Sequence, residues 1–242
     1  MNSAPAPDEP AGSAPTSTGA ADGGATSDAA AVRLALAGGS AVVLPNPAPL
    51  TCVVAGTDPA AVNAAKQRPP GQAVALWAHH PDTVGRLAGL LDLEPAGLRL
   101  ARRLLAEELL TLLVPLRGDR TPPGWLGPAS RDGWALLFGA RRPGLRPLLD
   151  AFPLLYVSSA NRTGQPPCAT AAQAAAVFAP AVPVLADPDG PAAELGPDAR
   201  RATTTVRLHP DGGLELHRHG AQDAGHPGVA ADYLAHLLRS YA

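Results

Sequence analysis

The stretch that decides the fold reads Val157-Ser158-Ser159-Ala160-Asn161-Arg162-Thr163-Gly164-Gln165-Pro166-Pro167-Cys168. The apolar run 154–157 leads into it and is long enough for a buried strand. Thr170 follows it, at the head of an alanine-rich segment with Gln173 three residues on, which is the pattern of a helix capping box. The sequence therefore predicts a strand, a polar turn and a helix start in that order.

The polar turn between this strand and this helix is a candidate anion site. Backbone N–H groups and the positive end of a helix dipole both favour a phosphate or carboxylate at such a junction. An ordinary well-capped turn is the alternative, because serine, asparagine and glycine are common loop residues. Residues elsewhere in the chain have to decide between the two.

The 242-residue chain divides into a polar N-terminal part and a globular remainder. Residues 1–30 are mainly Ala, Gly, Ser, Thr and Pro, without Lys, Arg or an aromatic residue, and predict a disordered tail. Residues 31–225 fit one α/β domain, and residues 226–242 an amphipathic helix packed on it. The formal net charge of −2 is too small to indicate nucleic-acid binding on its own.

Several protein classes do not fit this composition. Cys52 and Cys168 are too few for a disulfide framework, and no Cys/His spacing resembles a zinc site. The adjacent His79 and His80 have no third ligand at metal spacing, so we expect them to be solvated loop histidines. No apolar run is long enough to span a bilayer, and the start lacks a secretory-signal pattern. We therefore expect a cytoplasmic protein with reduced thiols and no resident metal.

Strand and helix patterns alternate along the domain. We expect helices over residues 32–37, 59–66, 81–91, 95–106, 143–151 and 228–241, with one more after Thr170. We expect strands over residues 41–44, 50–54, 73–77, 109–116, 134–138, 154–157 and 182–185, and a hairpin of 203–208 with 214–218. The alternation indicates an α/β fold, and the hairpin indicates that its sheet is mixed.

Lys66 is the only lysine in the chain, beside eighteen arginines. A compact ammonium suits a phosphate contact in a tight space where a planar guanidinium does not fit. Arg68 follows at the end of the same predicted helix and can grip phosphate oxygens with two N–H groups. The alternative is a lysine that remains by chance on a solvated helix end.

Five short motifs come in the order seen in the YrdC-like family, the threonylcarbamoyl-AMP synthases of tRNA modification. The chain resembles that family from about residue 41 to residue 220. The motifs are Lys66-Gln67-Arg68-Pro69, Glu108-Leu109-Leu110-Thr111, Ser158-Ser159-Ala160-Asn161 with Gly164, Thr203-Thr204-Thr205-Val206 and Arg218-His219-Gly220.

The resemblance implies a YrdC-like fold, a twisted mixed α/β sheet flanked by helices with a concave basic face. It implies a nucleotidyltransferase that makes L-threonylcarbamoyladenylate from threonine, bicarbonate and ATP. Mg²⁺ accompanying ATP is the implied cofactor, and double-stranded RNA or a tRNA-modification protein an implied partner. Such an enzyme mainly positions reactants and stabilises charge.

The resemblance also implies roles for single residues. Lys66 and Arg68 would be the catalytic pair, in contact with the phosphates or with the carbamoyl carboxylate. Asn46 and Thr51 would remain from the amino-acid pocket. The ATP-binding residues would be Thr111, Ser159, Asn161, Thr204 and Arg218.

The chain departs from the family at the amino-acid pocket. The family loop P-T-[DE]-[TA]-[VY]-[YF]-G corresponds to Pro45-Asn46-Pro47-Ala48-Pro49-Leu50-Thr51. Gln72 stands where the family has a second lysine, and Leu137 near its strand arginine. Each lost charge-assisted hydrogen bond is worth roughly 1.5–3 kcal/mol. Two further readings therefore stay open: a paralogue for another carbamoylation, and a non-catalytic protein that binds nucleotide or double-stranded RNA.

Overall fold

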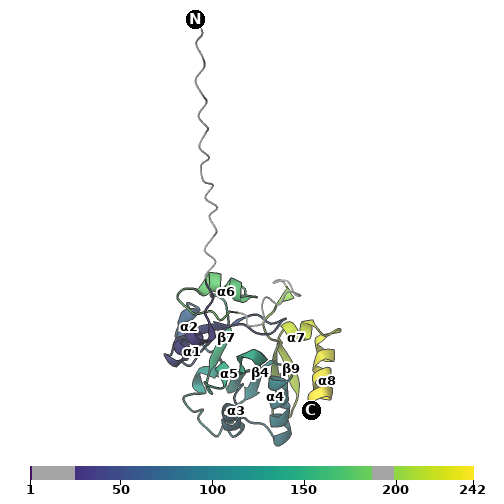
Figure 1. Ribbon diagram of the computed structural model, residues 1–242. Coiled ribbons are helices and arrows are strands. Elements are labelled where there is room, and N and C mark those ends of the chain that lie inside the picture. The colour runs from purple at the N-terminus through teal and green to yellow at the C-terminus, as the bar shows by residue number, and fades with distance from the viewer. Residues whose placement is uncertain (2–24, 187–198) are drawn as a thin grey trace.

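The chain folds around one mixed β-sheet (Figure 1). This computed structural model describes Met1, residues 25–186 and residues 199–242. The strands are β1 (Val42–Leu44), β2 (Val53–Gly56), β3 (Ala75–Trp77), β4 (Thr111–Pro115), β5 (Ser130–Arg131), β6 (Trp134–Phe138), β7 (Tyr156–Ser159), β8 (Thr205–Leu208) and β9 (Leu214–Arg218).

Helices connect most of these strands. They are α1 (Ala29–Ala37), α2 (Pro59–Ala65), α3 (Pro81–Ala88), α4 (Pro95–Ala106), α5 (Arg146–Leu149), α6 (Ala171–Phe178), α7 (Ala221–Ala224) and α8 (Ala230–Tyr241), with 3₁₀ turns η1 (Gly127–Ala129) and η2 (Pro143–Leu145). The described residues contain no helix long and apolar enough to cross a bilayer.

The strand order is β1-β2-β7-β3-β6-β4-β8-β9, with β5 added to one end of β6. The pairs β3–β6 and β4–β8 are parallel, and the other pairs are antiparallel. The expected hairpin is present as β8 and β9. The prediction of a mixed α/β sheet is therefore confirmed.

Apolar side chains on the two faces of the sheet form two separate cores. The first core holds Val54, Leu76, Leu112 and Leu137 together with buried residues of α2, α3, α4, α6 and α8. The second core holds the alternate strand residues, among them Val53, Ala75, Phe138 and Val157, with residues of α1 and α5. Alternation of side chains along each strand produces this division.

Local capping signals set several helix starts. Asp58 accepts a hydrogen bond from the Ala60 N–H at 2.8 Å, with Pro59 in the first helical position of α2. Thr170 Oγ1 accepts from the Gln173 N–H at 3.2 Å at the start of α6. The Gln173 side chain reaches back to the Ala169 N–H at 2.8 Å, one residue earlier than a capping box predicts.

The folded domain begins earlier than the composition suggests. The Ser27 N–H donates to the Val184 carbonyl at 2.7 Å, and Asp28 caps α1 by accepting from the Ala31 N–H at 2.8 Å. Residues 27–30 are therefore part of the domain, although the sequence assigns them to the tail. Residues 2–24 of that expected tail lie outside the described residues.

The segment 182–185 differs from its prediction as a strand. Val184 and Leu185 make only isolated bridges, to Val43 and Ser27. Pro183 has no N–H to donate, which prevents a continuous ladder, and its carbonyl accepts from the Val43 N–H at 2.8 Å.

The C-terminal helix α8 lies beside α4 (Figure 1). Both phenol groups of α8 reach one carboxylate: Tyr233 donates to Glu108 at 3.0 Å and Tyr241 donates to it at 2.8 Å. The Arg103 guanidinium donates to the carbonyls of Ser240 and Tyr241 at 3.1 Å. These bonds hold α8 against the segment that leads into β4.

Candidate functional site

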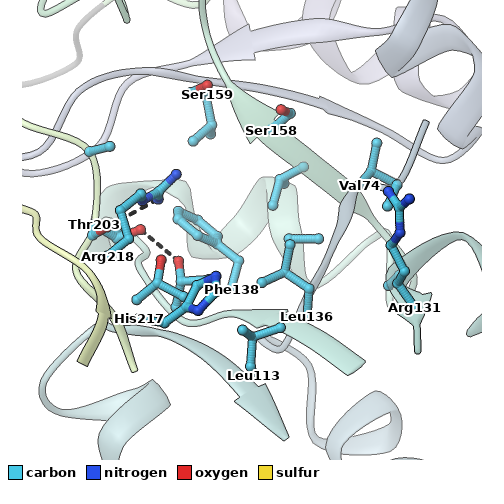
Figure 2. A pocket seen from close by; sticks show the side chains of 18 of the residues that line it. Val74, Leu113, Arg131, Leu136, Phe138, Ser158, Ser159, Thr203, His217 and Arg218 are labelled. Atoms are coloured by element: carbon cyan, nitrogen blue, oxygen red, sulfur yellow. Dashed lines mark hydrogen bonds between the residues drawn. The ribbon is translucent and has the colours of Figure 1, made fainter. Parts of the chain in front are cut away.

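A cavity of about 430 Å³ lies on the sheet face that carries the second core (Figure 2). Its walls come from strands β2 to β9, from η1 and from the loops that precede β2, β3 and β8. The lining residues are Asn46, Thr51, Val53, Arg68, Ala73, Val74, Ala75, Thr111, Leu113, Ala129, Arg131, Trp134, Leu136, Phe138, Val157, Ser158, Ser159, Ala202, Thr203, Thr205, His217 and Arg218.

The cavity has an apolar centre with polar groups around it. Figure 2 shows Leu136 and Phe138 of β6 between Arg218 on one side and Arg131 on the other, with Ser158 and Ser159 along the end of β7. A ligand that fits this arrangement has an apolar or planar part and charged groups at its ends.

The charged groups of the lining are cationic. Arg68, Arg131 and Arg218 line the cavity, and no Asp or Glu occurs among the described residues that line it. Burial lowers the pKa of Arg68 and of Arg218, yet an arginine in a protein keeps its charge at neutral pH. Arg68 Nη2 is buried and has no hydrogen-bond partner among the described residues. The cavity is therefore suited to an anion.

Arg218 is fixed at the end of β9. Its Nη2 donates to the Thr203 carbonyl at 3.2 Å, and Figure 2 shows the bond. The hydroxyls of Thr203 and Thr111 lie 2.6 Å apart in a hydrogen bond between the loop before β8 and the start of β4. Arg68 is held in a similar way, because its Nε donates to Asn63 Oδ1 on α2.

Lys66 lies behind the cavity wall, with 3% of its surface exposed, and does not line the cavity. Its ammonium donates to Asn161 Oδ1 at 2.7 Å, to Ser159 Oγ at 3.3 Å and to the Ser159 carbonyl oxygen. Burial, with the nearby Arg68 charge, lowers the pKa of Lys66 from 10.5 to about 8. The expected convergence of Lys66, Ser159 and Asn161 is present, but the three donors of the ammonium go to protein oxygens.

Asn161 organises the turn after β7 and does not line the cavity either. Its Nδ2 donates to the Arg162 carbonyl at 3.0 Å and to the Gln165 carbonyl at 2.7 Å. The chain then returns to the sheet, where the Cys168 N–H donates to the Ala160 carbonyl at 2.7 Å. Residues of α6 do not occur in the cavity lining, so the expected helix dipole is not at this site.

Thr204 points away from the cavity, and its neighbours take the expected place. The Thr204 side chain is fully buried and donates to Asp223 Oδ1 at 2.6 Å. Thr203 and Thr205 line the cavity instead, because alternate residues of an extended segment face the same side.

The sequence comparison placed Leu137 near the family's strand arginine, and the same alternation moves the cavity-facing position to its neighbour Leu136. Leu137 packs in the first core, whereas Leu136 faces the cavity. Gln72 is exposed and outside the lining; its backbone carbonyl accepts from Asn63 Nδ2 at 2.8 Å, and its N–H donates to the Pro69 carbonyl at 3.1 Å. Asn46 and Thr51 do line the cavity, and Asn46 Nδ2 donates to the Thr51 carbonyl at 2.9 Å.

Several lining residues were not anticipated from the sequence. For Leu113 the signal is the two-residue period of a strand that already held an expected site residue. Ser158, Thr203, Thr205 and His217 are immediate sequence neighbours of expected site residues. Extending that period from Thr111 finds Leu113, and placing β6 antiparallel to β4 finds the rest of the floor. The residues missed include Leu113, Arg131, Trp134, Leu136, Phe138, Ser158, Thr203, Thr205 and His217. Across the described segments, no group of three His, Cys, Asp or Glu residues is arranged to hold a metal ion.

No family model and no curated protein matches the sequence. Among solved structures, P. abyssi Sua5 complexed with L-threonine matches with a TM-score of 0.56 at 20% identity, over 80% of this chain and 55% of that one. E. coli YciO matches with a TM-score of 0.58 at 15% identity, over 84% and 95% of the two chains. Full-length HypF in a phosphate- and nucleotide-bound form matches with a TM-score of 0.57 at 15% identity, over 81% of this chain and 29% of that one.

This chain thus spans a little over half of the Sua5 structure but nearly the whole of YciO. Sequence identities this low support a similarity of fold and nothing more. The chain has the YrdC-like fold, because its strand order and flanking helices agree with these structural matches.

Proposed function

We propose that the cavity binds ATP and that the chain forms a carbamoyl-type adenylate there, with L-threonylcarbamoyladenylate as the first product to test. One observation carries the proposal: Arg68, Arg131 and Arg218 surround an apolar floor, and the part of the lining that the structure describes has no carboxylate. Phosphates match the guanidinium groups, and the base and ribose match the apolar centre.

Two of the similar structures support the same ligand classes. One is a Sua5 complexed with L-threonine, and the other is a HypF bound to phosphate and nucleotide. The proposal transfers both ligand classes, amino acid and nucleotide, to this chain, with bicarbonate as the source of the carbamoyl carbon.

The reaction needs charge stabilisation rather than a protein nucleophile. The amino group of the acid attacks carbon dioxide from bicarbonate, loses a proton and becomes a carbamate. A carbamate oxygen then attacks the α-phosphorus of ATP, and pyrophosphate leaves. Arg68 and Arg218 would neutralise the charge that develops on the phosphate oxygens, at positions fixed by Asn63 and Thr203.

Mg²⁺ would accompany ATP as part of the substrate. The described lining residues include no carboxylate that could hold the metal. Its ligands would then be phosphate oxygens and water, as is common for this ion.

Pyrophosphate release tests the proposal. Wild-type chain is incubated with ATP, Mg²⁺, bicarbonate and a panel of amino acids, and the products are weighed by mass spectrometry. An adenylate with the mass of the carbamoylated acid is the expected product. Arg218→Met should weaken ATP binding roughly tenfold to a hundredfold, since one charge-assisted hydrogen bond is lost. Arg99→Met, an exposed change on α4, is the matched control and should bind ATP as wild type does.

A second candidate is a non-catalytic protein that binds nucleotide in the same cavity, or binds double-stranded RNA. The apolar floor favours it, since Leu113 and Leu136 offer no charge to a second carboxylate. ATP binding without pyrophosphate release for any amino acid would leave this candidate in place. Unchanged ATP affinity in Arg68→Met and Arg218→Met would exclude ATP binding, and with it the adenylate reaction, from this cavity.

A further inference from the structure

The parallel ladder between β4 and β8 is interrupted at its first step. The register pairs Thr111 with Thr205, and the Thr111 N–H donates to the Thr204 carbonyl at 3.0 Å. A regular parallel ladder would continue with a bond from the Thr204 N–H to the Leu109 carbonyl. That N–H instead donates to Gln222 Oε1 at 2.8 Å, and Gln222 Nε2 donates to the Leu109 carbonyl at 3.0 Å. One side-chain amide therefore stands where a direct backbone bond would be.

The backbone at Leu109 explains why the direct bond is not made. Its φ of 61° lies in the left-handed region, which a bulky residue rarely adopts, and it interrupts the extended chain before β4. The Glu108 carbonyl also accepts from Gln222 Nε2, at 3.4 Å. Because Nε2 can only donate and Oε1 can only accept, the amide fits this gap in one orientation.

The backbone of Gln222 is fixed to the same segment that its side chain bridges. The N–H groups of Gln222 and Asp223 both donate to Thr204 Oγ1 at 3.1 Å. The Thr204 hydroxyl donates in turn to Asp223 Oδ1 at 2.6 Å. The Ala221 N–H donates to the Ala202 carbonyl at 2.9 Å. These bonds hold α7 on the loop before β8, so the Gln222 amide is in place without a ligand.

The gap that Gln222 fills adjoins one end of the cavity. Thr111 on β4 and Thr203 before β8 both line the cavity, and their hydroxyls lie 2.6 Å apart. Arg218 lines the same end and donates to the Thr203 carbonyl at 3.2 Å (Figure 2). Gln222 is not among the described residues that line the cavity, so it acts on a ligand only through these neighbours. Two hydrogen bonds in series replace one, which sets the distance between the starts of β4 and β8.

We infer that Gln222 is a positioning residue, whose amide spaces the starts of β4 and β8 so that Thr111, Thr203 and Arg218 are held in place for a polyphosphate. This inference rests on the proposed function for the nature of the ligand. Without the amide, the Thr204 N–H and the Leu109 carbonyl lose the group that joins them, and the two strand starts can shift relative to each other. Arg218 is bonded to one of these segments and shifts with it.

Scalar coupling across hydrogen bonds, measured by NMR in the ligand-free protein, tests the inserted amide. The Thr204 amide nitrogen should couple to the side-chain carbonyl carbon of Gln222. A coupling from the same nitrogen to the Leu109 carbonyl carbon would show a continuous ladder and would overturn the inference.

Calorimetric binding of inorganic tripolyphosphate and of ATP tests the effect on the cavity. Gln222→Met keeps the length of the side chain without its donor and acceptor, and should bind both probes about fivefold more weakly or worse. Gln173→Met is the matched control, because Gln173 also accepts from a backbone N–H, that of Ala169 at 2.8 Å, but lies outside the lining. It should bind as wild type does.

Three results would overturn the positioning role. They are wild-type affinity in Gln222→Met, an equal loss in Gln222→Met and Gln173→Met, and no binding of tripolyphosphate to wild type at millimolar concentration. If Gln222→Met does not fold, Gln222→Asn replaces it, since its amide is one methylene too short to reach both strand starts. The same loss is expected there, and wild-type affinity would again contradict the role. These measurements need no amino acid or bicarbonate, so pyrophosphate release can fail while the positioning role stands.

Discussion

The Lys66 ammonium donates to Asn161 Oδ1 at 2.7 Å and so ties the end of α2 to the turn that follows β7. The same ammonium reaches the Ser159 carbonyl and hydroxyl, so one buried charge fixes a residue of the cavity wall. The lysine thereby acts on the cavity through Ser159, and a guanidinium, with its planar fork, does not fit the same three oxygens.

Lys66→Met should lower the free energy of unfolding by about 1–3 kcal/mol, because buried oxygens lose their donor. Urea denaturation measures the change. Arg99→Met removes an exposed cation and should leave the midpoint unchanged. A Lys66→Met protein as stable as wild type would mean that these bonds do not contribute to stability.

His79 should make the protein acid-sensitive. Burial, followed by the Arg141 charge, lowers its pKa from 6.5 to about 4, contrary to the expected solvated histidine. The neutral ring is therefore favoured in the folded state. Its contribution to stability is complete above pH 6.5 and is lost as the pH falls toward 4.

The variant His79→Phe tests this titration. Phenylalanine keeps a ring near Trp77, whose centroid lies 5.4 Å from that of His79, but it cannot take up a proton. Chemical denaturation at several pH values should show a smaller loss of stability between pH 6.5 and pH 4 in the variant than in wild type. Parallel curves would contradict the prediction.

Leu136→Arg and Leu137→Arg should behave in opposite ways, although they change neighbouring residues. Leu136 faces the cavity, so an arginine at this position has room and the protein should fold. Leu137 is 1% exposed in the first core, where an unpaired cation is strongly destabilising. Circular dichroism melting curves distinguish the two. If both variants melt as wild type does, the register assigned to β6 is wrong.

Gly220→Ala should disturb the Arg218 end of the cavity. A methyl group there would overlap the backbone of Ala202, Thr203 and Thr204, which cannot move without shifting the cavity wall. We expect lower stability and at least tenfold weaker ATP binding. Gly225→Ala is the matched control at the end of the same helix, where the nearest backbone oxygen would be at an ordinary 3.7 Å. Equal behaviour of the two variants would show that the close approach is unimportant.

Local signals were sufficient for much of the fold. The helix 95–106 and the strand 134–138 have the expected bounds, because a proline in the first helical turn and an uninterrupted apolar run are strong markers. The segment 182–185 was misassigned, because its pairing depends on Pro183 and on partners far away in the sequence.

The site was predictable in its location and less so in its contacts. Arg68, Thr111, Ser159 and Arg218 were chosen from the order of the motifs, and all four line one cavity. Which neighbour faces that cavity depends on strand register, and the expectations for Thr204 and Leu137 missed it by one residue. The hydrogen-bond partners of Lys66 are oxygens more than ninety positions away in the sequence, and a local motif does not reveal them.

The burial of the chain's single lysine also makes it a chemical reporter. An acylating reagent needs an accessible amine, and the Lys66 nitrogen is not accessible while it is surrounded by Ser159 and Asn161. The rate of Lys66 acylation, followed by mass spectrometry, would therefore report how often the domain opens, and no residue has to be engineered for it.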